Sequence, residues 1–254
     1  MSVQSAKIEA ESPLVRRFGV AAALAGALAL GGWSTVAARA DDAARPMLLA
    51  QATSTDGASS EAADVKVPDA EGKVDVEKLM AAEELPDVVI GDKDAPVTIV
   101  EYASLTCSHC RDFHQVTYPA IKKDFIDTGK AKLIIREFPF DPRALAAFML
   151  ARCAGDDAKR TAMVDVLFDQ QPQWAYSNQA SAELLKISRL AGMSEEQFRA
   201  CLNDKELQKK VVAVQQRGEN DFGVSATPTF FVNGDKYAGA LEPAQMAAVI
   251  KQHM

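Results

Sequence analysis

The chain has 254 residues, of which 48% are hydrophobic and 25% are charged, proportions that are ordinary for a soluble globular protein. Its formal net charge of −7 argues against nucleic acid or an anionic membrane surface as the main partner, because neither attracts an acidic protein. Four cysteines are too few for a disulfide-dense scaffold, so their positions matter more than their number.

Residues 1–40 are expected to be a signal peptide for export. Arg16 and Arg17 supply the positive charge, residues 18–30 are apolar and uncharged, and Ala38-Arg39-Ala40 fits a small-residue cleavage site. An uncleaved membrane anchor is the alternative, although the apolar run is shorter than a membrane span. We therefore expect a periplasmic protein, in a compartment where thiols oxidise and disulfides persist.

The next segment, residues 41–75, is rich in Ala, Ser, Asp, Gly and Thr and is typical of a flexible leader. The folded domain is expected over residues 76–254. Residues 87–90 predict a short edge strand, and the β-branched, apolar run 96–102 predicts a buried strand. A second long strand is predicted over 131–138.

A helix is expected between the two long strands, over residues 107–127. Pro119 should kink this helix because proline has no backbone N–H to donate. The β-α-β order implies parallel strands with a right-handed crossover. Residues 142–222 have apolar residues at helical spacing and predict a helical insert, in which Ser194-Glu195-Glu196-Gln197 resembles a capping box.

The chain closes with a predicted hairpin and a helix. Residues 229–232 and 236–238 are strand-like, and Asn233-Gly234 between them indicates a type I′ turn. Residues 242–253 predict the last helix. The order β-α-β, helical insert, β-β-α indicates an α/β fold.

The chemistry of the chain centres on Cys107-Ser108-His109-Cys110, which follows a predicted strand and opens a predicted helix. The first turn of a helix has unpaired N–H groups and the positive end of the helix dipole, which stabilise a thiolate on Cys107. The thiolate is the nucleophile of disulfide exchange, and Cys110, one turn deeper, can attack a mixed disulfide. His109 adds a donor that should lower the pKa of Cys107 further.

A Cys-x-x-Cys pair has two other interpretations. It could be half of a zinc site with His109 or His114 as further ligands, but such a site needs four ligands, and Cys153 and Cys201 lie in a different, helical region. It could also be a structural disulfide, which the position at a helix start makes less favourable. We expect no metal and no cofactor.

A second signal is Thr227-Pro228, at the entrance to an apolar strand. Proline removes a hydrogen bond from a sheet and is therefore confined to edges, strand starts or bulges. A cis bond here would place the backbone of Thr227 at the surface facing the dithiol, ready to pair with an extended peptide. A trans proline at a strand start is the commoner alternative.

These two segments, EYASLTCSHC over residues 101–110 and GVSATPTFFVNG over residues 223–234, resemble the DsbA branch of the thioredoxin superfamily. The likeness covers about residues 85–254 and implies a thioredoxin fold with an inserted helical subdomain. It also implies a role for each matched residue. Cys107 would attack, Cys110 would resolve, His109 would stabilise the thiolate, Pro228 would be a cis-proline, and Thr227 would precede it at the substrate.

Glu101 matches an acid that is buried beneath the active site in this family. A carboxylate in an apolar strand is costly to bury, so it is expected to hold and relay protons, and an outward-facing strand position is the alternative. His114 is expected to be a helix-surface residue. Ser108 stands where the family often has proline, and because this position tunes the reduction potential, the strength of the oxidant stays open.

Cys153 and Cys201 both lie in the predicted insert. We favour a structural disulfide between them, because disulfides persist in an oxidising compartment, over two buried free thiols.

The resemblance implies a thiol oxidase that donates the Cys107–Cys110 disulfide to newly exported proteins and is reoxidised by a membrane quinone-linked partner of the DsbB kind. An isomerase or reductase is the nearest alternative, and a metal-binding or chaperone module is the second. The leader has no long heptad pattern, which favours a monomer over a stalked oligomer.

Overall fold

The computed structural model describes residues 65–254. The expected signal peptide, 1–40, and residues 41–64 of the expected leader lie outside the described residues. Within 65–254, no helix combines the length and the apolar character needed to cross a membrane.

A six-stranded sheet in the order β1-β6-β5-β3-β4-β2 forms the centre of the domain. The two long strands, β3 and β4, are parallel neighbours and are almost entirely buried, as their apolar composition predicts. On its other side β3 pairs antiparallel with β5. The strands are β1 (Gly72–Lys73), β2 (Val89–Ile90), β3 (Val97–Ala103), β4 (Ala131–Glu137), β5 (Thr229–Val232) and β6 (Asp235–Ala238).

Strand β1 lies inside the segment 41–75 that was expected to be a flexible leader, so that boundary is wrong at its end. The strand is held by its pairing with β6: the backbone N–H groups of Glu71 and Val74 donate to the carbonyls of Lys236 and Gly234. A two-residue strand is too short to show an alternating pattern, so the sequence carries no local signal for it.

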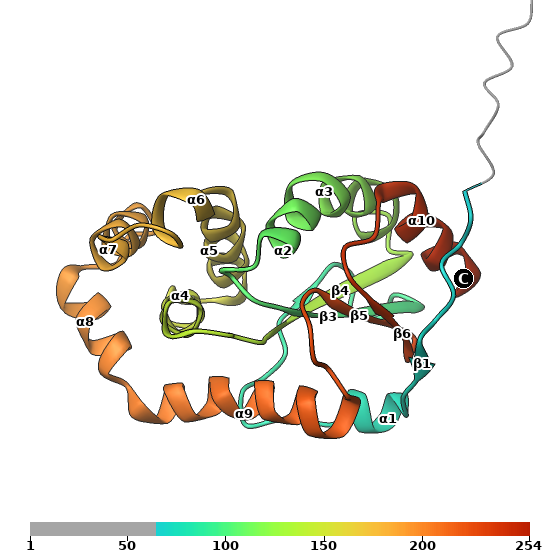
Figure 1. The fold of residues 1–254 in the computed structure, drawn as a ribbon, viewed down its shortest axis with the longest axis horizontal. Coiled ribbons are helices and arrows are strands. Elements are labelled where there is room, and N and C mark those ends of the chain that lie inside the picture. The colour runs from blue at the N-terminus through green and yellow to red at the C-terminus, as the bar shows by residue number, and fades with distance from the viewer. Residues whose placement is uncertain (1–64) are drawn as a thin grey trace, which may run out of the picture. The chain divides into compact units, whose positions relative to one another are not determined.

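Helices cover both faces of the sheet, and a group of helices extends beyond it (Figure 1). α2, α3 and α10 lie on one face, α1 and α9 lie on the other, and α4 to α8 lie beyond the sheet. The bounds are α1 (Val76–Leu79), α2 (Ser108–Asp112), α3 (Tyr118–Ile121), α4 (Pro142–Arg152), α5 (Asp157–Asp169), α6 (Gln171–Trp174), α7 (Ala180–Leu190), α8 (Glu195–Asn203), α9 (Lys205–Phe222) and α10 (Pro243–Gln252).

The helix expected over residues 107–127 contains two π-helical stretches, η1 (Phe113–Thr117) and η2 (Lys122–Ile126), on either side of α3. Pro119 lies in the first turn of α3. Because its nitrogen has no hydrogen, it cannot continue the α-helical ladder from the preceding turn. The disturbance expected at Pro119 therefore takes the form of a change in helix type.

The insert begins and ends where the helical pattern predicts, with α4 to α9 occupying Pro142–Phe222. The capping box is present: the Ser194 hydroxyl accepts from the Gln197 N–H, and the Gln197 side chain accepts from the Ser194 N–H. A disulfide joins Cys153, directly after α4, to Cys201 in α8, with Cα atoms 6.2 Å apart. This bond ties two helices of the insert together.

The hairpin of β5 and β6 turns through Asn233 and Gly234, which have φ angles of 46° and 92°. A type I′ turn requires two consecutive residues in the left-handed conformation, which explains why Asn and Gly occupy these two positions. The Asn233 side chain also accepts a hydrogen bond from the Thr98 N–H at 2.8 Å, which fixes the turn against β3.

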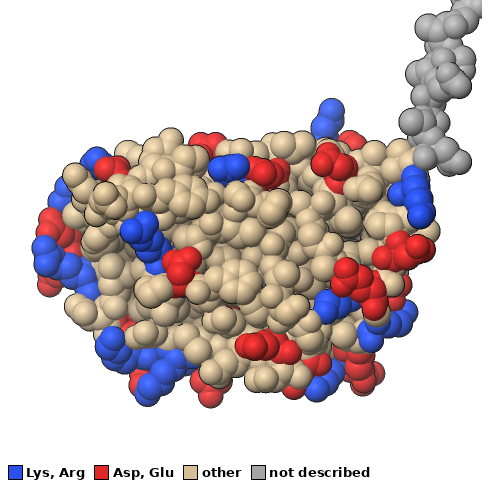
Figure 2. Space-filling model, viewed as in Figure 1, with Lys and Arg blue, Asp and Glu red and all other residues tan. Residues whose placement is uncertain are grey.

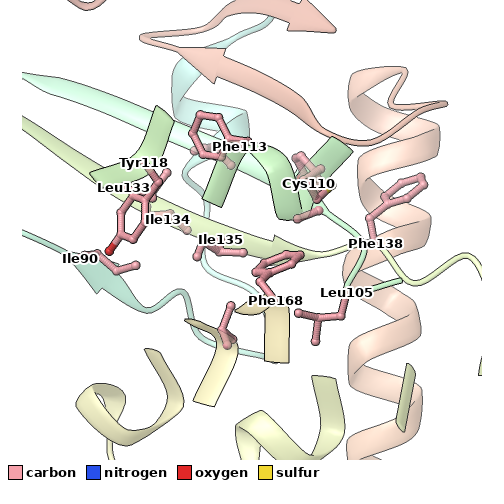
Figure 3. Packing of buried hydrophobic residues seen from close by; sticks show 14 of the residues in the cluster. Ile90, Leu105, Cys110, Phe113, Tyr118, Leu133, Ile134, Ile135, Phe138 and Phe168 are labelled. Carbon is pink, nitrogen blue, oxygen red and sulfur yellow. The ribbon is translucent and has the colours of Figure 1, made fainter. Parts of the chain in front are cut away.

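The core lies between the sheet and its helices (Figure 3). Leu105, Cys110, Phe113 and Phe168 pack with Ile135 of β4, and all are nearly inaccessible to solvent. The active-site helix and the insert thus contribute to one hydrophobic core.

On the other face of the sheet, Gly218 of α9 lies directly against the Tyr102 ring. A Cβ atom at Gly218 would lie 2.6 Å from Tyr102 Cε1. The ring has no room to move, because Tyr102 is fully buried and its hydroxyl accepts from Arg136 at 3.0 Å.

We predict that Gly218→Ala destabilises the protein by about 1–3 kcal/mol, although alanine is the better helix former by about 1 kcal/mol. Denaturant unfolding would measure the change. Gly72→Ala is the matched control, because a Cβ there meets nothing within 4 Å. A Gly218→Ala protein as stable as the parent would show that α9 can shift away from β3.

Candidate active site

Cys107 and Cys110 are both free thiols at the start of α2. Cys107 is the N-cap residue, with an extended backbone at φ −79° and ψ 122°, and is partly accessible. Cys110 lies in the first turn and is fully buried. Between them, Ser108 is half-buried and His109 is exposed. The helix start thus presents one sulfur to solvent and hides the other.

The loop before β5 meets this helix start. Tyr102 at the end of β3 pairs with Thr229 at the start of β5, so residues just after β3 and just before β5 are neighbours. The Cys107 thiol donates to the Thr227 carbonyl at 3.3 Å, and the Thr227–Pro228 bond is cis. The sheet register therefore brings together the two sequence segments that carry the motifs.

The surroundings of Cys107 favour its thiolate. A hydrogen bond from the Cys110 thiol is the largest of the effects that lower the pKa of Cys107 to about 5, against an opposing effect of burial. The Thr227 side chain and the backbone N–H groups of Cys110 and His109 add to the lowering. The backbone of the helix start thus acts as the sequence predicts, while a role for the His109 imidazole stays a prediction.

The surroundings of Cys110 favour its thiol. Burial raises the pKa of Cys110 well above its ordinary value, and its hydrogen bond to Cys107 and the nearby charge of Glu101 act in the same direction. Two chemically identical side chains are therefore separated into a nucleophile and a proton carrier.

Glu101 is fully buried in β3, and the Nε2 atom of His114 lies 2.9 Å from its Oε2 atom. The expectation that His114 is a helix-surface residue is wrong: its side chain is only 2% exposed. The reason is visible in the spacing, because His114 is four residues after the buried Cys110 and therefore shares its side of the helix. That spacing was the available signal.

Gln171 is a site residue that the sequence did not reveal. Its fully buried amide donates to the carbonyls of Leu105 and Cys107, both at 2.9 Å, from the first position of α6. The Thr106 hydroxyl also donates to Asp141, the N-cap of α4. The insert therefore holds the backbone that leads into the dithiol.

A family model described as thioredoxin matches residues 83–252. The crystal structure of α-DsbA1 from Wolbachia pipientis has a TM-score of 0.65 and 33% identity, over 69% of this chain and 94% of that chain. This chain is a DsbA-like member of the thioredoxin family. The predicted α/β thioredoxin fold with a helical insert is thereby confirmed.

Two further relatives extend the comparison. A Rickettsia typhi protein, named as a candidate protein-disulfide oxidoreductase, is 39% identical over 148 residues, which are 58% of this chain and 55% of that protein. BdbD from Bacillus subtilis shares the fold, with a TM-score of 0.61 at 22% identity, over 73% of this chain and 98% of that chain. The chain spans about half the length of the curated relatives it matches.

Among residues 65–254 of this DsbA-like chain, no group of three or more His, Cys, Asp or Glu side chains is placed to hold a metal ion. With its own groups, the site can form and break a disulfide bond at the Cys107 sulfur, while Cys110 gains or loses a proton.

We predict that alkylation of the reduced protein at Cys107 has a midpoint near pH 5, because the thiolate is stabilised. In Cys110→Ala the donor thiol is lost, so the midpoint should rise toward the ordinary thiol value of about 8.5. Mass spectrometry of the alkylated protein across pH would measure both. His109→Gln tests the imidazole in the same assay. An unchanged midpoint in Cys110→Ala would mean that the donor thiol does not stabilise the thiolate.

Proposed function

We propose that this protein is an exported thiol:disulfide oxidoreductase, and that it acts as an oxidase by donating the Cys107–Cys110 disulfide to newly exported proteins. The observation that carries the proposal is the opposite perturbation of the two cysteines, which lowers the pKa of Cys107 to about 5 and raises that of Cys110. A stabilised thiolate favours the reduced dithiol, and a disulfide whose reduced form is stabilised is a strong oxidant.

The proposed reaction has two exchange steps. A substrate thiolate attacks the Cys107 sulfur, the Cys107–Cys110 bond breaks, and Cys110 leaves and takes up a proton. A second substrate thiolate then attacks the substrate sulfur of the mixed disulfide and releases Cys107 as a thiolate. The substrate loses two electrons and gains a disulfide, and the enzyme becomes the dithiol.

The proposed substrates are reduced, unfolded polypeptides rather than one folded partner. The carbonyl of Thr227 lies beside the reactive sulfur and offers a backbone contact that any extended peptide can use. On the face shown in Figure 2, acidic and basic side chains are interspersed around a largely uncharged centre. Such a surface supports contact with polypeptides of many different sequences.

Export and reoxidation complete the proposal. The Cys153–Cys201 disulfide supports an oxidising compartment, because such bonds are rare in reducing ones. The signal-like sequence of residues 1–40 supports the periplasm. The reduced enzyme would return to its disulfide form through a membrane quinone-linked partner of the DsbB kind, and the protein would act as a monomer.

Equilibration with glutathione buffers would separate an oxidase from a reductase. We predict a reduction potential for Cys107–Cys110 well above the value of about −270 mV that is typical of thioredoxin. A value at or below that figure would contradict the oxidase direction, and Ser108→Pro would then show how far this residue sets the potential.

We also predict that Cys110→Ala accumulates mixed disulfides between Cys107 and client proteins that already contain a disulfide, because the Cys107 thiolate attacks the client disulfide and no second cysteine is present to release the adduct. Non-reducing electrophoresis of periplasmic extracts would detect these adducts. Cys107→Ala is the matched control and should form none. Adducts that survive in Cys107→Ala would place the nucleophile elsewhere.

A further inference from the structure

Beneath the dithiol, Glu101 and His114 form a buried pair that the exchange steps above leave without a role. Their Oε2 and Nε2 atoms are 2.9 Å apart, and their side chains are 0% and 2% exposed. The remaining polar atoms of the pair, Glu101 Oε1 and His114 Nδ1, have no hydrogen-bond partner within residues 65–254.

Glu101 is linked electrostatically to the resolving cysteine. Its charge is one of the causes that raise the pKa of Cys110. Cys110 is fully buried, so the proton it gains as a leaving group, and loses before it attacks, has to cross the protein. Glu101 is a titratable group that can exchange this proton.

His114 connects the pair to a surface cavity that is separate from the dithiol. The imidazole stacks on Phe168 of α5 at 4.2 Å and 16° and lines a cavity of about 480 Å³ between η1, α3 and α5. Neither cysteine of the motif nor Thr227 lines it. Its rim is exposed to solvent at Gln115, Pro119, Asp165 and Asp169.

The groups that face His114 suit proton transfer. Glu101 of β3 lies on one side of the imidazole, and Asp165 and Asp169 of α5 lie at the cavity. Lys122 of η2 and Tyr118 of α3 also line the cavity, and burial raises the pKa of the Tyr118 phenol. α10 also packs against η1, and its buried residues are apolar. The His114 imidazole therefore lies between the carboxylates of Asp165 and Asp169 at the cavity rim and the buried carboxylate of Glu101.

We propose that His114 is the positioning residue through which Glu101 exchanges protons with solvent, by way of the cavity between η1, α3 and α5. This inference rests on the proposed function. Because neither Cys107 nor Thr227 lines this cavity, a polypeptide bound at those two residues would leave it as a separate path to solvent.

The proton balance defines the step that depends on His114. When a mixed disulfide between Cys107 and glutathione closes, the Cys110 thiol gives its proton to Glu101 and its sulfur attacks the Cys107 sulfur. The Cys107–Cys110 bond forms, and glutathione leaves as a thiolate. The proton passes from Glu101 through His114 to solvent. Formation of the mixed disulfide needs only the Cys107 thiolate and should not depend on His114.

The test compares the parent protein with His114→Gln and His114→Ala. Reduced protein is mixed with glutathione disulfide, the reaction is quenched with acid, and the mixed disulfide is followed by mass spectrometry. Glutamine can keep a hydrogen bond to Glu101 but cannot carry a proton. His253→Gln is the matched control, because His253 lies at the end of α10, with its Nε2 atom 3.6 Å from Asp235 Oδ2, and does not line the cavity.

We expect ring closure in His114→Gln to be slower by about tenfold or more near pH 5. Its rate should rise about tenfold per pH unit up to about pH 8, because the proton then has to leave to hydroxide, while the parent rate changes much less. Formation of the mixed disulfide should stay within about twofold of the parent. In His114→Ala, removal of the ring leaves a space beside the cavity, so added imidazole should restore ring closure. Added imidazole should leave the parent rate unchanged.

Equal closure rates in His114→Gln, His253→Gln and the parent across this pH range would overturn the proposal. Equal slowing of both steps in His114→Gln would also overturn it, because a relay acts only on Cys110. Thermal unfolding of each variant identifies loss of structure, and if His114→Ala does not fold, the pH profile of His114→Gln decides alone. A parent protein that forms no mixed disulfide at all would instead contradict the proposed function.

Discussion

The contact between the Cys107 sulfur and the Thr227 carbonyl joins two residues that are 120 positions apart in the sequence. It exists because β3 and β5 are antiparallel neighbours, so that the chain leaving one strand passes the chain entering the other. The rest of the site follows from this position. Once the sulfur is fixed against Thr227, the first helical turn directs Cys110 into the core, where the charge of Glu101 in β3 acts on it. The sheet thus determines which thiol meets a substrate and which meets the protein interior.

The site achieves a division of labour between identical groups by solvation. Hydrogen-bond donors of the helix start and of Cys110 lower the pKa of Cys107, while burial and a nearby negative charge raise the pKa of Cys110. Each effect strengthens the other, because the thiol that stays protonated is the donor that stabilises its neighbour as an anion. Between the two cysteines, half-buried Ser108 stands in place of the family's frequent proline.

Local signals predicted most of the frame and part of the site. The buried strands, the Asn233-Gly234 turn, the capping box at Ser194 and the bounds of the insert were visible because each depends on neighbouring residues. The sequence did not reveal β1, which is ordered only by pairing with β6, or Gln171, whose two acceptors are more than 60 residues away. His114 was misjudged although its spacing from Cys110 was available, because a polar residue on a helix was assigned to the surface.

The hydrogen bonds of Gln171 have a consequence for any attempt to transplant this chemistry. A graft of residues 101–110 onto a thioredoxin scaffold that lacks the insert would carry the cysteines but leave behind the amide that holds the carbonyls of Leu105 and Cys107. Those carbonyls would then be free to rotate, and the N–H groups that face the sulfur would lose their fixed direction. The transferable unit is therefore the motif together with α6, two segments that are distant in the gene and inseparable in the folded protein.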